Sequence, residues 1–170
     1  MKHIILLSDS HGSLDERFFP YFEKADEIWH AGDIGDLTIT DKLKEFSKLR
    51  AVWGNIDNQK IRSEFKKEIY FKCEDVKVMM THIGGYPDRY NKRILPMIKK
   101  NKPNLFITGH SHILKVMYDK KNKLLHMNPG AIGNFGIHKV KTLLSFKINN
   151  DEIKDLNVIE FTKNLTNPIC

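Results

Sequence analysis

The sequence contains few cysteines and lacks long apolar runs. Cys73 and Cys170 are the two cysteines among 170 residues, which excludes a disulfide framework. The first apolar run holds four consecutive residues, Ile4 to Leu7. That run is too short for a signal-peptide core or a membrane span, so we expect a cytoplasmic protein that makes no membrane contact.

Linkers, internal repeats and low-complexity segments are missing as well. No stretch is rich in Pro, Gly and Ser together, and a chain of this length is sufficient for one hydrophobic core. Hydrophobic residues make up 41% of the chain and charged residues 29%, as in soluble globular proteins. We therefore expect a single domain over residues 1–165, followed by a loose tail over 166–170.

Charge is abundant but unevenly distributed. The formal net charge is +7, yet residues 1–45 carry 5 Lys and Arg against 10 Asp and Glu, so the basic excess lies in residues 46–170. A basic surface could attract phosphate-bearing partners, or it could be a solvated lysine-rich face. The lysines do not alternate with aromatic residues as in a single-strand binding groove. Nucleic acid is therefore a conceivable partner that is not favoured.

The pattern of apolar residues predicts a mixed α/β domain. Runs typical of strands occupy residues 3–8, 27–30, 49–53, 68–73, 76–81, 105–108, 115–119, 123–127, 142–148 and 153–161. Helices are predicted over 14–24, with Ser13 as N-cap, over 38–46, and over 93–100 despite a proline in mid-segment. Strands and helices alternate early and strands dominate later. This order predicts two packed sheets with helices outside.

Polar side chains follow five of the predicted strands, often with glycine beside them. The polar residues are Asp9, His11, Asp33, Asp36, Asn55, Asp57, His82, His110, Ser111 and His112, and the glycines beside them are Gly32, Gly54 and Gly109. In open α/β sheets, ligands bind at the carboxyl ends of the strands, where loops bring distant sequence positions together. We therefore expect these residues to surround one site.

The residue types at this site indicate metal binding. Imidazole, carboxylate and amide oxygen without thiolate suit Mn²⁺, Fe²⁺, Zn²⁺, Co²⁺ or Ni²⁺. Seven candidate ligands are too many for one ion but are suitable for two ions that share a carboxylate and keep positions open for substrate. They are Asp9, His11, Asp33, Asn55, His82, His110 and His112. Paired ions of this kind are typical of phosphoryl-transfer sites.

In this order, the motifs resemble those of the calcineurin-like metallophosphoesterases. They are Asp9-Ser-His11, Gly32-Asp33-Ile-Gly-Asp36, Gly54-Asn55-Ile-Asp57, His82 and Gly109-His110-Ser-His112. The match spans roughly residues 3–148, and the small size with a late Asn-Pro-Gly resembles the compact prokaryotic phosphodiesterase branch, the YfcE-like group. This resemblance implies a four-layer αββα sandwich of two mixed β-sheets flanked by helices.

The resemblance also implies a ligand set. The first ion would bind Asp9, His11, Asp33 and His112, and the second would bind Asp33, Asn55, His82 and His110. Asp33 would bridge the two, while Asp36 would support the site without being a ligand. We expect two divalent ions per chain, with Mn²⁺ first and Ni²⁺, Co²⁺, Fe²⁺ or Zn²⁺ as alternatives.

One position departs from the widest form of the family. There, a histidine follows the Asn and helps to protonate the leaving oxygen, whereas this chain has Ile56. General acid catalysis contributes about 10²–10⁴-fold, so we expect hydrolysis of activated phosphodiesters, such as aryl esters, in preference to alkyl esters and phosphomonoesters. His138 is a candidate substitute acid, whereas His30 is expected to close a strand by hydrogen bonding.

Other functions compete with a metal-dependent phosphodiesterase acting on a small phosphorylated substrate. A non-catalytic scaffold is one alternative, because the retromer scaffold subunit resembles this fold and works by binding partners. The seven intact ligand positions favour an enzyme over this scaffold. A nuclease of the same family is the other alternative, but the missing general-acid histidine argues against it.

Overall fold

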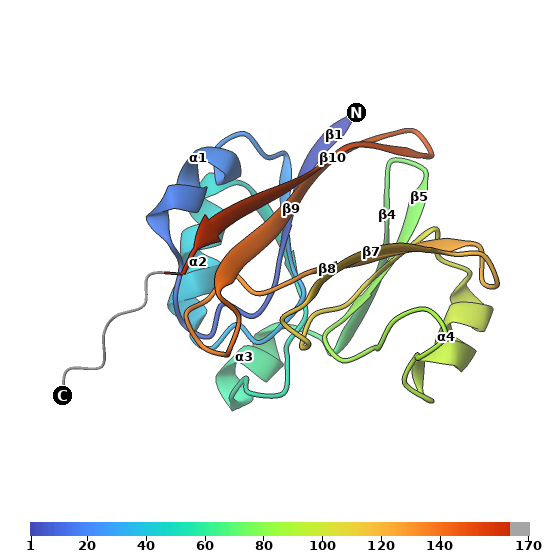
Figure 1. Ribbon diagram of the computed structural model, residues 1–170, viewed down its shortest axis with the longest axis horizontal. Helices are drawn as coiled ribbons and strands as arrows, with labels where there is room; N and C mark the ends of the chain where they lie inside the picture. Colours follow the sequence, from blue (N-terminus) through green and yellow to red (C-terminus); the bar gives the residue numbers. More distant parts are fainter. Residues whose placement is uncertain (164–170) are drawn as a thin grey trace.

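The computed structural model describes residues 1–163 and contains two five-stranded sheets (Figure 1). The first consists, in spatial order, of β10 (Glu152–Thr162), β9 (Val140–Asn149), β1 (Lys2–Leu7), β2 (Glu27–His30) and β3 (Lys48–Ala51). The second consists of β4 (Glu68–Cys73), β5 (Val76–Thr81), β6 (Leu105–Ile107), β8 (Leu124–Pro129) and β7 (Leu114–Asp119). Residues 166–170, expected to be a tail, lie outside the described residues.

Strand β1 shows how the sequence produces layers. Ile4 and Leu6 pack into the core between the sheets, where Trp29, Val78 and Met80 also lie. Ile5 and Leu7 point the other way, because successive side chains alternate between the two faces of a strand, and pack with the helices. A strand that is covered on both faces must be apolar throughout, as residues 4–7 are.

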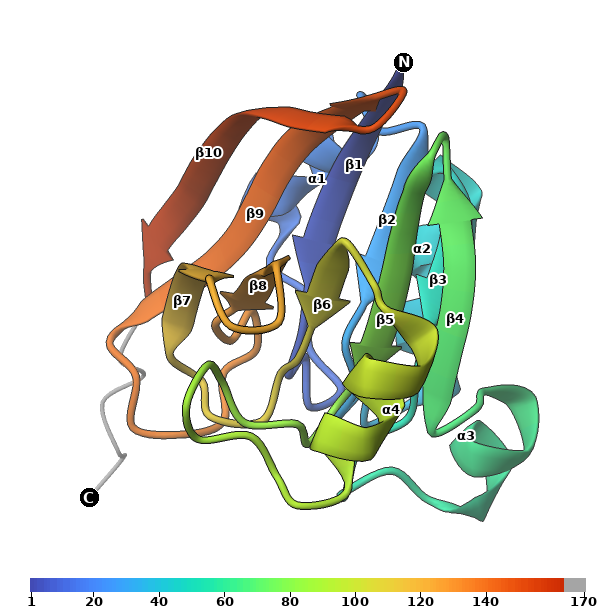
Figure 2. The ribbon, with the colours of Figure 1, turned by 90° about the vertical axis from the view of Figure 1, so that its right-hand side faces the viewer.

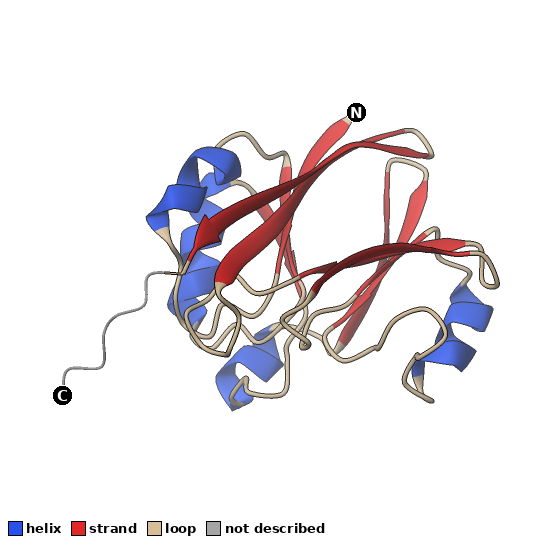
Figure 3. Cartoon of the chain, viewed as in Figure 1, coloured by secondary structure: helices blue, strands red, loops and turns tan. Residues whose placement is uncertain are grey.

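Helices cover the outer faces of both sheets (Figure 3). Elements η1 (Glu16–Phe18), α1 (Phe19–Phe22), α2 (Leu37–Phe46) and α3 (Gln59–Glu64) contribute apolar side chains to the cluster on the first sheet. Helix α4 (Ile94–Asn101) packs Ile94 and Ile98 against Met79 and Phe106 of the second sheet. The expected four-layer αββα sandwich is confirmed.

Two of the helices predicted from the sequence formed nearly as expected. Helix α2 begins after its N-cap Asp36, whose side chain accepts a hydrogen bond from the backbone N–H of Thr38. In α4, Pro96 is the third helical residue. The first backbone N–H groups of a helix have no partner inside it, so a proline in this turn removes no helical hydrogen bond.

The prediction of one helix over 14–24 was wrong. A 3₁₀ turn over Glu16–Phe18 leads into a single turn of α1, and Asp15 instead of Ser13 is the N-cap. Pro20 lacks a backbone N–H, which weakens a continuous helix through this segment. The hydroxyl of Ser13 donates to the Ser10 carbonyl and accepts from the Asn134 N–H, so it joins two loops.

Parallel strands bring the polar loops to one edge. Strands β1, β2 and β3 are parallel, and so are β5, β6 and β8. Figure 2 shows the arrowheads of β1, β5 and β6 directed toward the same edge of the molecule. Within residues 1–163, no helix is both long enough and apolar enough to cross a membrane.

Candidate metal centre

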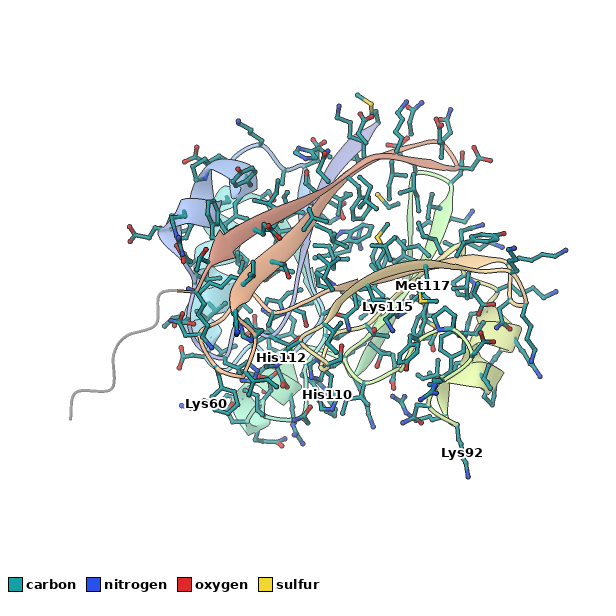
Figure 4. All side chains as sticks on the ribbon, in the orientation of Figure 1. Lys60, Lys92, His110, His112, Lys115 and Met117 are labelled. Carbon is teal, nitrogen blue, oxygen red and sulfur yellow. The ribbon has the colours of Figure 1, made fainter. Side chains whose placement is uncertain are left out.

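Loops from both sheets form the candidate site, at the carboxyl ends of β1, β2, β3, β5 and β6. Five of the seven expected ligands have a left-handed backbone, with φ between 47° and 70°: Asp9, His11, Asp33, His110 and His112. Residues other than glycine rarely adopt this conformation, and it concentrates at functional sites. Figure 4 labels His110 and His112 near the edge where these loops meet.

The first group of potential ligands consists of Asp9, His11 and His112. Asp9 Oδ1 lies 3.2 Å from His112 Nε2 and 3.8 Å from His11 Nε2. The other oxygen, Asp9 Oδ2, accepts a hydrogen bond from the backbone N–H of His110 at 3.1 Å. One carboxylate oxygen is thus fixed by the backbone, and the other faces two imidazole nitrogens.

The second group consists of Asp33, His82 and His110. Asp33 Oδ1 lies 3.2 Å from His82 Nε2, while Asp33 Oδ2 lies 3.7 Å from His11 Nε2. The two oxygens of one buried carboxylate therefore face different groups. Each group also draws on both sheets, because Asp9 and Asp33 follow strands of the first sheet and the other sheet contributes His82, His110 and His112.

Two polar atoms at this point are buried without a hydrogen-bond partner among residues 1–163: Asp9 Oδ1 and His82 Nε2. They are 3.9 Å apart. Burial of such atoms without a partner costs about 1–3 kcal/mol each, so these atoms need a ligand. Oxygen and imidazole nitrogen without thiolate suit a divalent transition-metal ion, and the residues therefore fit the metals that the sequence implied.

The hydrogen bond of His82 to the backbone and the ionised state of Asp33 suit ion binding in the second group. His82 Nδ1 lies 2.8 Å from the Ala31 carbonyl, which accepts its proton and leaves Nε2 to face Asp33. This is the usual outer hydrogen bond of a metal-binding histidine. Burial would raise the pKa of Asp33, but the contact with the His82 imidazole and the hydrogen bond from the Ile56 N–H lower it overall. The Asp33 carboxylate is therefore ionised, the form that binds a cation.

Ile56 contributes to the site through its backbone. Its N–H donates to Asp33 Oδ1 at 3.1 Å, while its side chain is 45% exposed. The preceding Gly54 is required by a close approach, because a Cβ there would overlap Asp33 Oδ1. The loop after β3 thus holds Asp33 by close packing and a backbone hydrogen bond, for which the apolar Ile56 side chain is not needed.

The supporting carboxylate is Asp57, which was not singled out from the sequence as a support. It is buried and accepts hydrogen bonds from the N–H groups of Ile34, Gly35 and Gly54 at 2.7–3.1 Å. It therefore ties the loop after β2 to the loop after β3. The support expected of Asp36 is corrected here, since Asp36 caps α2 and its carboxylate contacts Thr38.

Asn55 lies beside the second group but is exposed. It lines a cavity of about 220 Å³ together with Trp53, His82 and other residues. Its backbone carbonyl accepts a hydrogen bond from the guanidinium of Arg62, a residue of α3, at 3.0 Å. Its role as a ligand stays a prediction.

The remaining histidines have distinct surroundings. His30 is fully buried, accepts from the Gly32 N–H and bonds to the Ser10 hydroxyl, as expected of a structural residue. Burial lowers the pKa of His30 to about 3. His138 packs edge-on against His112, with ring centroids 5.3 Å apart, and its Nε2 bonds to the Gly133 carbonyl. His138 therefore lies beside the site, and its role as an acid stays a prediction.

Comparison with known proteins identifies relatives of this chain. The calcineurin-like phosphoesterase superfamily domain matches residues 1–151. A probable metallophosphoesterase of Methanocaldococcus jannaschii is 33% identical over 134 residues, which cover 74% of this chain and 66% of that relative. The aligned part thus spans just under two thirds of the relative's length.

Solved structures share the fold. An archaeal phosphodiesterase superposes with a TM-score of 0.67 at 19% identity, covering 92% of this chain and 99% of its own. Vps29 of Entamoeba histolytica, complexed with Zn²⁺, superposes with a TM-score of 0.72 at 15% identity, covering 95% of this chain and 99% of its own. At such identities, the likeness is one of fold alone.

The match of the family domain extends over most of the chain and includes both groups of potential ligands. The fold and the positions of these residues at the carboxyl ends of the strands agree with that match. The chain belongs to the calcineurin-like phosphoesterase superfamily.

Proposed function

We propose that the protein hydrolyses phosphodiester bonds of small molecules with two divalent metal ions, Mn²⁺ being the first candidate. The observation that carries this proposal is the position of Asp33, whose two oxygens face His11 and His82. A carboxylate so placed suits two ions with a shared ligand. When bound, such a pair supplies a nucleophile near neutral pH and stabilises charge on the phosphoryl group.

The chain's own residues orient the carboxylates of the site, and glycine keeps side-chain atoms away from them. The buried carboxylates of Asp9 and Asp33 are oriented by backbone N–H groups from neighbouring loops. A Cβ on Gly109 would overlap the Ser8 hydroxyl and approach Asp9 Oδ2. The position after Asn55 offers no proton, because its side chain is the apolar Ile56. The leaving oxygen must therefore depart without an acid from that position.

The first experiment tests the metal requirement. Protein stripped with a chelator is expected to lose hydrolysis of bis(p-nitrophenyl) phosphate and to regain it with Mn²⁺, because Asp9 Oδ1 in the first group and His82 Nε2 in the second are each buried without a partner. Ni²⁺, Co²⁺, Zn²⁺ and Mg²⁺ are added in parallel, and p-nitrophenyl phosphate is the monoester comparison. We expect the diester to be preferred by about tenfold or more, a difference of about 1.4 kcal/mol in activation free energy.

The outcomes of this experiment separate the candidate functions. Activity that survives in metal-free protein would contradict the proposal. Ion binding by a folded protein that hydrolyses neither ester would favour the non-catalytic scaffold. The similarity to Vps29 does not decide between these functions, because it is a similarity of fold alone. Binding of DNA or RNA with a steep salt dependence would favour the nuclease.

A second prediction concerns Ile56. The Ile56→His variant is expected to accelerate hydrolysis of esters with poor leaving groups by about 10–100-fold, because it adds a proton donor at the leaving oxygen. Methyl aryl phosphates with phenols of increasing pKa measure this effect. The dependence of kcat/KM on leaving-group pKa should become shallower. The Ile56→Asn variant, which removes the apolar side chain without adding an acid, is the control, and equal slopes for both variants would refute the argument.

A further inference from the structure

Exposed apolar side chains are concentrated around the candidate metal centre. Five of the thirteen large apolar side chains exposed in residues 1–163 lie in its loops. These five form what we call the apolar rim: Ile56 (45% exposed), Ile83 (36%), Ile113 (62%), Phe135 (68%) and Ile137 (102%). The three rim isoleucines nearest the N-terminus each directly follow an expected ligand, namely Asn55, His82 and His112.

Contacts connect the rim to the expected ligands. The Phe135 ring lies against that of His11, with centroids 5.0 Å apart. Gly136 packs so closely on His112 that a Cβ would overlap its ring, so the segment that carries Phe135 and Ile137 runs beside the first group. Ile83 and Ile113 line one cavity of about 210 Å³ together with His110. The rim therefore reaches both groups of potential ligands.

The rim is not explained by folding. None of its five side chains belongs to the three buried clusters that form the core of residues 1–163. Single exposed apolar residues are ordinary on protein surfaces, but a group of them beside a polar site indicates a binding surface. Ligand pockets combine apolar walls with a few fixed polar groups, and the carboxylates and imidazoles here would be those polar groups.

We infer that the apolar rim binds the organic part of the substrate, and that this part is an apolar alkyl or aryl ester group. The inference rests on the proposed phosphodiesterase function and specifies its substrate class. The phosphoryl group would lie at the imidazoles and carboxylates, so an ester substituent leaving that point must pass over the rim. A hydrophilic substituent, such as a sugar or a nucleotide chain, would leave these five side chains in water.

The experiment varies the ester group while the leaving group stays constant. Methyl, butyl and hexyl p-nitrophenyl phosphates share p-nitrophenolate, so the chemistry of bond cleavage is the same. Full burial of one methylene changes affinity about fourfold, and a half-exposed rim should give about twofold per methylene in kcat/KM. The Phe135→Ser/Ile137→Ser variant should reduce this gain per methylene by at least half, a ratio that is taken within the variant and does not depend on its activity toward the methyl ester. Both residues lie outside the core, so the variant is expected to fold.

A matched control is available on β10. Leu156 and Val158 are exposed apolar residues at 39% and 45%, on an edge strand that carries no expected ligand. The Leu156→Ser/Val158→Ser variant should keep the chain-length dependence of the unmodified protein. Equal loss in both double variants would contradict a specific role of the rim.

A binding measurement separates this inference from the proposed function. The affinity of methyl alkylphosphonates of the same chain lengths, measured by calorimetry with Mn²⁺ present, requires no turnover. Affinity that rises with chain length supports the rim even if no ester is hydrolysed, an outcome that would overturn the proposed function alone. Hydrolysis and binding that are both independent of chain length would overturn the rim alone. Affinity or hydrolysis that rises only at concentrations where these compounds aggregate would also overturn the role of the rim. The protein would then recognise the surface of the aggregates and not a single alkyl chain.

Discussion

Replacement of Asp33 by asparagine is expected to reduce kcat/KM for bis(p-nitrophenyl) phosphate by about 10³-fold or more, as for residues that act together in one catalytic unit. The amide keeps the size of the side chain, and asparagine tolerates the φ of 55° found at this position. The folded structure should therefore persist. One anionic oxygen is lost, and with it the carboxylate that faces both groups of potential ligands.

The measurement should include the amount of bound metal as well as activity. Mass spectrometry of the purified variant is expected to find less Mn²⁺ per chain than in the unmodified protein. Asp36→Asn is the matched control from the same Gly-Asp-Ile-Gly-Asp motif, since Asp36 is exposed and caps α2. Unchanged activity of the Asp33 variant, or an equal loss in both variants, would show that Asp33 is not the shared ligand.

Replacement of Asp57 by alanine is expected to destabilise the fold by about 3 kcal/mol or more. The variant would leave the N–H groups of Ile34, Gly35 and Gly54 without their acceptor, and each such buried donor costs about 1–3 kcal/mol. For a chain of this length, a loss of 3 kcal/mol lowers Tm by roughly 6–12 °C. Affinity for Mn²⁺ should fall by about 10–100-fold, because the loops that carry Asp33 and Asn55 would lose the carboxylate that joins them.

Thermal unfolding and titration with Mn²⁺ measure these two effects. Asn58→Ala is the neighbouring control, because Asn58 caps α3 by accepting from the Ile61 N–H and contacts neither ligand group. Loss of a helix cap costs about 1 kcal/mol. A comparable small loss for Asp57→Ala, with unchanged Mn²⁺ affinity, would mean that the loops after β2 and β3 keep their shape without this carboxylate.

Local sequence patterns correctly predicted those helices and strands that depend mainly on neighbouring residues in the sequence. The hairpin of β4 and β5 turns at Glu74, as expected from two apolar runs that flank two acidic residues. The predictions that failed concern segments whose secondary structure is determined by tertiary contacts. Segment 14–24 follows the apolar spacing of a helix, yet its aromatic residues pack on the first sheet as separate turns. Helix α3 was missed because it is six residues long, although Asn58 is a recognisable cap.

The site was predictable to the extent that parallel strands determine it. Side chains after β1, β2, β5 and β6 were expected at one edge, and the structure brings Asp9, Asp33, His82 and His110 together there. The supporting residue was not predictable in this way. Asp36 and Asp57 both lie two or three residues after an expected ligand, and the path of each loop decides which one is buried. Loop paths depend on left-handed residues that apolar patterns do not reveal.

The division of each ligand group between the two sheets has a mechanical consequence. The carboxylates follow strands of the first sheet, and three of the imidazoles follow strands of the second. A bound ion would therefore cross-link the two sheets of the sandwich at the edge where their loops meet. Separation of the sheets, the first step in exposing the core between them, would then require that ligand bonds break. Ion occupancy would thus govern the lifetime of the folded chain as well as its chemistry.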